Sequence, residues 1–218
     1  MINRGGQTHT FKVKAEKLNS PLISEIFEEN NKRIGYILIE YFTNTVEEEF
    51  AKALNDLEAQ GIDSLIIDVR SNTGGYLKGA TSIASIFLEK GKTIYSLEGK
   101  DSTDVYVDET DEKRDYKVAV LINDGSASAS EVLAAALKES YGATLIGTTS
   151  YGKGKVQLTK NLEDGSMVKY TTARWLTPSG ECIDEIGIDP DYLVNLEQDE
   201  NGVYKDTQLE KAKELLSQ

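Results

Sequence analysis

The chain has 218 residues, of which 28% are charged and 39% hydrophobic, and its formal net charge is −13. This length suits one sizeable domain, or one domain with a small appendage. Nucleic-acid binding needs a basic surface, so the acidity argues against nucleic acid as a partner. No apolar run approaches the roughly 20 residues that cross a membrane, and the first residues (MINRGG) lack the apolar core of a signal peptide.

Strand-like and helix-like periodicities alternate along the chain. Strands are predicted, in chain order, over residues 6–18, 34–42, 64–69, 93–97, 118–122, 143–147, 156–158 and 167–173. Helices are predicted from a capping box at Thr45 and Glu48 to a stop at Gly61, and over residues 78–89, 132–139 and 206–216. Residues 22–29 are left unassigned, and the charged stretch 98–116 is predicted to be an exposed loop or hairpin.

The order of these elements predicts an α/β fold. Strand–helix–strand alternation from residue 34 to 147 indicates right-handed crossovers on a largely parallel sheet flanked by helices, and the part after Val156 is more β-rich. Sites on such sheets lie beyond the carboxyl ends of the strands. Polar turns at residues 72–75 and 123–128 follow two such ends, so we expect the functional site there.

A single histidine and a single cysteine limit the chemistry that the chain can carry. Cys182 has no partner for an internal disulfide, and nothing beside it marks it as a nucleophile. Two such residues do not make a structural zinc site, and no metal or other cofactor is predicted. His9 is the one candidate base for a Ser–His–Asp triad, and its place near the terminus on a predicted strand argues against that role.

A serine–lysine pair fits the polar turns better. Ser128 lies in the run GSASASE at residues 125–131, where a strand meets a helix, and Lys153 lies between two glycines in YGKGKVQ at residues 151–157. Such a lysine must be neutral to act as a base, so its pKa must fall from about 10.4 by roughly three units. Neighbouring carboxylates oppose this fall, so desolvation of Lys153 would have to dominate.

Each of these segments also has a simpler interpretation. Ser128 and Glu131 match a capping box, and on that local pattern alone a helix cap is favoured over a nucleophile. Residues 147–153 match the first seven positions of a phosphate-binding loop, but Gly154 stands where a hydroxyl should hold magnesium, and an extended segment follows instead of a helix. Residues 72–75 fit an ordinary loop, or one that presents N–H groups to an oxyanion.

Five segments, taken together and in this order, resemble the C-terminal processing peptidases, or tail-specific proteases, of serine peptidase family S41. They are DVRSNTGG at residues 68–75, GSASASE at 125–131, residues 147–157, TPSG at 177–180 and GIDPD at 187–191. The resemblance covers roughly residues 34–195. It implies a fold related to the crotonase and Clp-protease cores.

The resemblance implies a serine endopeptidase that acts on unfolded or C-terminal segments of proteins through an acyl-enzyme. It places the nucleophile on Ser128, the general base on Lys153 and an assisting glutamine on Gln157. The alternatives are a non-catalytic ligand- or protein-binding module of the same fold, of which retinoid-binding modules are examples, and a core held inactive without further domains.

The resemblance also implies an oxyanion hole made by the backbone N–H of Ala129 and that of Gly74 or Gly75. Family members usually carry a PDZ domain, of which residues 1–20 would be a remnant or a linker, ahead of a protease core at residues 21–218. An extracytoplasmic location is implied, in the cell envelope, periplasm or medium, with membrane anchoring only through parts absent from this chain. An oligomer is compatible with the sequence.

Overall fold

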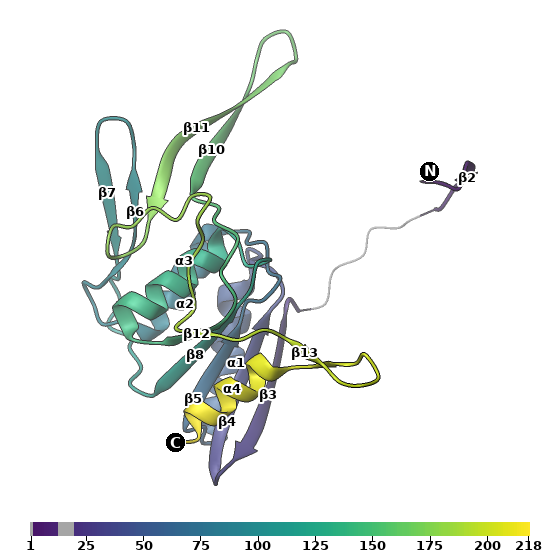
Figure 1. Cartoon of the computed structure of the whole chain (residues 1–218). Helices are drawn as coiled ribbons and strands as arrows, with labels where there is room; N and C mark the ends of the chain where they lie inside the picture. Colours follow the sequence, from purple (N-terminus) through teal and green to yellow (C-terminus); the bar gives the residue numbers. More distant parts are fainter. Residues whose placement is uncertain (1, 13–19) are drawn as a thin grey trace.

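The computed structural model of the chain describes residues 2–12 and 20–218, and it is built around a six-stranded sheet (Figure 1). The strand order is β12-β9-β8-β5-β4-β3. Neighbouring strands are parallel, except that β3 runs antiparallel to β4 at one edge. The strands are β3 (Leu22–Glu29), β4 (Lys32–Ile39), β5 (Ser64–Asp68), β8 (Lys117–Ile122), β9 (Thr144–Gly147) and β12 (Tyr192–Leu193). The predicted largely parallel sheet is confirmed, and the unassigned residues 22–29 form its antiparallel edge.

Helices cover both faces of this sheet. One face packs against α1 (Val46–Ala59), α2 (Leu77–Phe87) and α3 (Ala129–Ala136), and the other against α4 (Thr207–Leu216). Successive strand residues alternate between the two cores: Ile67 and Val120 belong to the first, and Ile66 and Leu121 to the second. Burial on both faces explains why these strands read as continuous apolar runs in the sequence.

A second sheet, four-stranded and antiparallel, extends from the side of the molecule that carries α2 and α3 (Figure 1). Its order is β10-β11-β6-β7, so the predicted β-rich C-terminal part is confirmed. Its strands are β6 (Thr93–Glu98), β7 (Thr103–Val107), β10 (Lys155–Asn161) and β11 (Met167–Leu176). The β10–β11 hairpin reaches beyond β6 into solvent. The charged stretch 98–116 contains the turn and second strand of the β6–β7 hairpin, and its residues 108–116 follow that hairpin without forming a strand.

Several predicted boundaries were wrong. Thr45 occupies the N-cap position of α1, but its side chain makes no cap hydrogen bond. Its hydroxyl donates instead to Glu49 Oε1 at 2.9 Å. The third helix begins at Ala129, three residues before the predicted start, and continues into a π-helical turn, η1 (Leu137–Tyr141). Of the strand predicted over residues 6–18, the described part shows only β2 (Gln7–His9), paired with β1 (Ile2–Arg4), while residues 13–19 lie outside the described chain.

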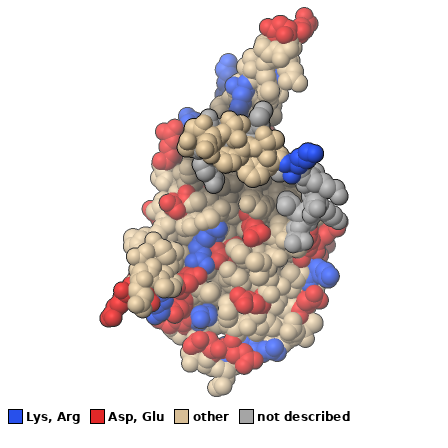
Figure 2. All heavy atoms as spheres, turned by 90° about the vertical axis from the view of Figure 1, so that its right-hand side faces the viewer, with Lys and Arg blue, Asp and Glu red and all other residues tan. Residues whose placement is uncertain are grey.

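The surface carries its charge in mixed form. Acidic and basic side chains are interspersed over the face seen in Figure 2, and acidic residues mark the tip of the projecting hairpin, where Glu163 and Asp164 lie. On this face the net negative charge is therefore spread out rather than gathered into one patch. The described helices include none with the length and apolarity that crossing a membrane requires.

Candidate active site

Ser128 lies at the junction between the turn after β8 and the first residue of α3. Its backbone has φ 58° and ψ −114°, a conformation that a non-glycine residue rarely adopts and that costs on the order of 1–3 kcal/mol. The side chain is half-buried. A strained serine at a helix N-terminus presents its hydroxyl where the helix dipole favours negative charge.

Ser128 and Glu131 adopt the predicted capping-box arrangement. The backbone N–H of Ser128 donates to Glu131 Oε2 at 2.7 Å. The N–H of Glu131 donates to the main-chain oxygen of Ser128 at 2.9 Å, and the Ser128 hydroxyl makes no cap bond although the two residues adopt the capping-box arrangement. The cap interpretation therefore does not account for the hydroxyl of Ser128.

Lys153 lies on the loop between β9 and β10, and its side chain is exposed. Its main-chain oxygen accepts from Trp175 Nε1 at 2.8 Å, which fixes the backbone of the loop. The flanking glycines are needed for close packing: a Cβ on Gly152 would lie 2.8 Å from the nitrogen of Gly187, and one on Gly154 would lie 2.8 Å from Cβ of Asp184. Because β10 follows directly, with no helix, the phosphate-loop interpretation has no structural support.

One cavity of about 380 Å³ brings the predicted residues together. Ser128, Lys153, Gln157 and Gly75 all line it. Its apolar lining consists of Leu77, Leu97, Val132, Val156 and Trp175, and Lys155 and Lys169 complete it. A chamber of this composition can hold an apolar side chain beside the hydroxyl and the amine.

The side chains of Ser128 and Lys153 are not hydrogen-bonded to each other in the described chain. The backbone N–H groups of both residues donate to Glu131, and the Tyr151 N–H donates to the main-chain oxygen of Ser126 at 3.0 Å. The desolvation of Lys153 that the sequence argument required is absent, because the loop leaves this side chain in water. Gln157 Nε2 donates to Thr171 Oγ1 at 3.4 Å and is also exposed.

The glycine turn at residues 72–75 distinguishes its two glycines. The Gly74 N–H donates to Asn72 Oδ1 at 2.8 Å and is therefore occupied. Among the described residues, the N–H groups of Gly75 and Ala129 have no hydrogen-bond partner. Gly74 packs so closely on the neighbouring turn that a Cβ would lie 3.0 Å from the Ala129 nitrogen. The two free N–H groups therefore belong to turns in direct contact.

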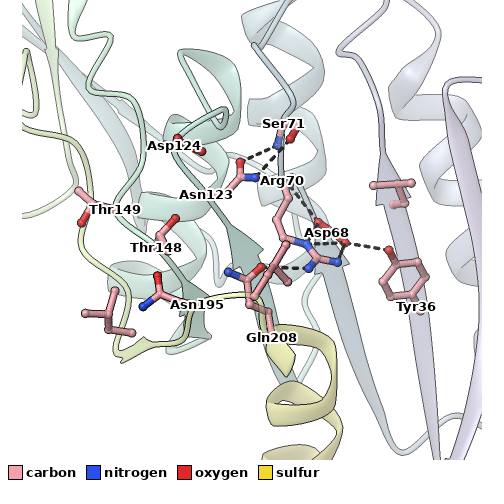
Figure 3. Close-up of a pocket in the computed structure, with 13 residues that line it drawn as sticks. Tyr36, Asp68, Arg70, Ser71, Asn123, Asp124, Thr148, Thr149, Asn195 and Gln208 are labelled. Atoms are coloured by element: carbon pink, nitrogen blue, oxygen red, sulfur yellow. Dashed lines mark hydrogen bonds and ion pairs between the residues drawn. The ribbon is translucent and has the colours of Figure 1, made fainter. Parts of the chain in front are cut away.

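A partly buried ion-pair network anchors the strand that leads into this turn (Figure 3). Arg70 contacts Asp68 at 2.7 Å and Asp206 at 2.7 Å, and its Nη1 donates to Gln208 at 3.0 Å. Burial, the charge of Asp68 and a hydrogen bond to Asp68 raise the pKa of Tyr36, whose hydroxyl donates to Asp68 at 2.8 Å. This network borders a hollow of about 820 Å³, which is larger than the cavity that Ser128 and Lys153 share. Neither of these two residues lines the hollow.

The sequence matches the peptidase family S41 over residues 33–194. The chain belongs to this family. It is 37% identical over 197 residues to a probable CtpA-like serine protease of Staphylococcus aureus (strain N315), a match that covers 89% of this chain and 39% of the relative. The relative of the same description in Staphylococcus epidermidis is 38% identical, with 89% and 40% covered. The S41 chain thus spans about two fifths of the length of these relatives.

Solved structures agree with this assignment. The photosystem II D1 C-terminal processing protease has a TM-score of 0.78 and 28% identity, with 94% of this chain and 54% of that chain covered. A lipoprotein from Streptococcus agalactiae, with a TM-score of 0.68 and 20% identity over 88% of this chain and 68% of its own, shares the fold. The chain therefore has the fold of a C-terminal processing protease, and its membership of family S41 agrees with the resemblance of its motifs.

Two residues of this candidate site were not singled out as site residues from the sequence. Glu131 was interpreted as a capping residue, yet its side chain is completely buried and contacts the Lys153 loop. Asn72 is also completely buried; its side chain holds Gly74 on one side and donates to the Ile39 carbonyl at 2.8 Å on the other. The spacing S-x-x-E was the one signal for Glu131, and it gave no indication of partners some twenty residues further along.

Proposed function

We propose that this S41 chain hydrolyses peptide bonds with Ser128 as the nucleophile and Lys153 as the general base. The observation that carries the proposal is their common cavity, in which a strained serine at a helix N-terminus lies near the one lysine of the glycine-flanked loop. The free N–H groups of Ala129 and Gly75 support it, because an oxyanion needs donors that are not already occupied.

The chemistry follows from these positions. Ser128 Oγ attacks the scissile carbonyl carbon, and its proton passes to the neutral amine of Lys153. The resulting oxyanion accepts from the Ala129 and Gly75 N–H groups, each worth roughly 10²–10³-fold in kcat if it behaves as other oxyanion donors do. When the intermediate collapses, Lys153 returns the proton to the leaving amine. Water then attacks the acyl-enzyme, with Lys153 again as base.

The bound polypeptide supplies what the free site lacks. Lys153 is exposed in the free chain, and a bound polypeptide would displace water from around it. An apolar side chain seated against Val132 and Trp175 would cover the cavity and move the amine toward the hydroxyl. Gln157 borders the same space and can accept a hydrogen bond from Lys153, which would orient the amine.

The substrate class follows from the relatives. We propose unfolded or C-terminal segments of proteins, because an extended chain can reach a site between two turns and because the chain resembles a D1 C-terminal processing protease. The same proposal includes an extracytoplasmic location and membrane anchoring through parts outside this chain. It also takes residues 1–20 as a linker or as the remnant of a preceding PDZ-like domain. These points rest on the resemblance to CtpA-like proteases.

Two substitutions test the assignment. Ser128→Ala and Lys153→Ala should each abolish cleavage of an unfolded protein such as casein, whereas Lys160→Ala, an exposed lysine further along β10, should cleave normally. Stoichiometric labelling of Ser128 by a fluorophosphonate would separate the enzyme from a binding module of the same fold. Undiminished cleavage by either of the first two variants would overturn the mechanism.

A further inference from the structure

Glu131 is a fully buried carboxylate that accepts four hydrogen bonds. Oε1 accepts from Ser150 Oγ at 2.7 Å and from the Gly152 N–H at 2.6 Å. Oε2 accepts from the N–H groups of Ser128 at 2.7 Å and Lys153 at 3.0 Å. A buried carboxylate is costly unless it is hydrogen-bonded in this way, so this set of contacts is built rather than incidental.

The four donors come from two separate loops. Ser128 belongs to the turn after β8, and the other three donors belong to the loop after β9, 19 to 22 positions from Glu131 along the chain. A single oxygen, Oε2, contacts the main chain of both members of the proposed pair. The Glu131 carboxylate therefore joins the two loops, alongside the Tyr151 N–H, which donates to the main-chain oxygen of Ser126 at 3.0 Å.

We infer that Glu131 is a positioning residue, which holds the nucleophile loop and the base loop at the separation that proton transfer requires. The inference rests on the proposed function and adds a residue that touches neither the substrate nor the reacting atoms. Three of the four donors are backbone N–H groups, which can only donate, so the group between them must accept at both oxygens. A glutamine at residue 131 has nearly the same shape, but one of its two terminal groups is an NH₂ donor. That group faces two of the four donors and cannot accept their hydrogen bonds.

Glu131→Gln should therefore move the two loops apart without leaving a cavity in the core. A displacement of about 1 Å can cost on the order of 10²-fold in rate, so we expect kcat to fall about 100-fold while KM changes little. Glu139→Gln is the matched control, because Glu139 is exposed and accepts a single backbone bond, from the Ser179 N–H at 2.7 Å. That variant should retain the activity of the parent protein.

A double-mutant cycle distinguishes positioning from mere structural support. The readout is the rate at which a fluorophosphonate labels Ser128 in the parent chain, Glu131→Gln, Lys153→Ala and the double variant. If Glu131 acts by placing Lys153, Glu131→Gln should slow labelling strongly in the parent chain and only weakly when Lys153 is already alanine. The two fold-changes in labelling rate should differ by at least a factor of ten. Equal slowing in both backgrounds, or an unchanged kcat for Glu131→Gln, would overturn the inference.

Ser150→Ala keeps the test decisive if Glu131→Gln does not fold. This variant removes one of the four bonds to Glu131 and adds no donor, although it also removes the bond that the Ser150 hydroxyl accepts from the Ile188 N–H at 2.8 Å. We expect kcat to fall about 3- to 10-fold, with the same dependence on Lys153. No fall in kcat, or a fall that is independent of Lys153, would contradict the inference. Failure of the proposed function looks different, because Ser128→Ala would then remain active.

Discussion

Gly74 lies directly against Ser128. A Cβ on Gly74 would come 2.9 Å from the Ser128 Cβ and 2.7 Å from the main-chain oxygen of Ala127, and Gly74 has φ 98°. Both distances are shorter than the contacts that Cβ atoms make in protein structures. One partner is a backbone atom, so relieving the clash would require the main chain to move. Only glycine therefore allows the turn at residues 72–75 to pack on the turn that carries the candidate nucleophile.

Gly74→Ala should consequently separate the two turns and inactivate the chain. Gly142→Ala is a matched control, since Gly142 has φ 95° and no heavy atom within 4 Å of the added Cβ. Both variants share the backbone strain of about 1 kcal/mol, so melting temperatures should fall in both, whereas cleavage of casein should be lost only with Gly74→Ala. Equal residual activity would show that the contact with Ser128 is unimportant.

Gln157→Ala should slow catalysis without weakening substrate binding. If Gln157 orients the amine of Lys153, its loss removes one hydrogen bond to that group, which corresponds to about a tenfold fall in kcat. Thr159→Ala, two residues along the same exposed strand, is the control and should have no effect. A changed KM with an unchanged kcat would instead assign Gln157 to substrate binding.

The sheet and the helices could be predicted because their signals are local. Apolar periodicity located β4, β5, β8, β9 and the helices to within a few residues, whereas the two-residue parallel strand β12 was not predicted. The β10–β11 hairpin was harder: only residues 156–158 of β10 were predicted, since beyond them the strand is exposed on both faces and lacks the alternation of a half-buried strand. The edge strand β3 was left unassigned, and most of its side chains are likewise exposed.

The site was predictable in its residues but not in its arrangement. Ser128, Lys153 and Gln157 were named from motifs, and the structure brings them to one cavity. The distinction between Gly74 and Gly75 depends on where the side chain of Asn72 points, which no pattern encodes. The exposure of Lys153 likewise depends on loop packing.

Asn72→Ala tests how far the glycine turn depends on one side chain. Asn72 is completely buried, and its loss leaves the Ile39 carbonyl and the Gly74 N–H without their partners, at about 1–3 kcal/mol in the free energy of unfolding. Urea denaturation measures this cost. Activity should fall as well, because an unoccupied Gly74 N–H competes with that of Gly75 for the oxyanion. Full activity in the folded variant would argue that the turn is held by other contacts.

Asp206→Asn should lower stability in a pH-dependent way. Burial alone would raise the pKa of Asp206, but hydrogen bonds from Arg70 and the Leu209 N–H outweigh it, so the pKa lies below its ordinary value. A carboxylate with a depressed pKa stabilises the folded state above about pH 4, its ordinary value, and this contribution is lost as the pH falls through the folded value. Asparagine can still accept the Leu209 N–H as the cap of α4.

The variant should therefore lose the ion pair with Arg70 and little else. Because the Asp206 side chain is 40% exposed, solvent screening limits the loss to about 1 kcal/mol, or about 2–4 °C in Tm, at neutral pH. The Tm difference from the parent should shrink as the pH falls below 4. Glu210→Gln, which breaks only the surface pair with Lys205 at 3.1 Å, should change Tm less. A Tm difference that persists in acid would mean that Asp206 stabilises the fold by its packing rather than by its charge.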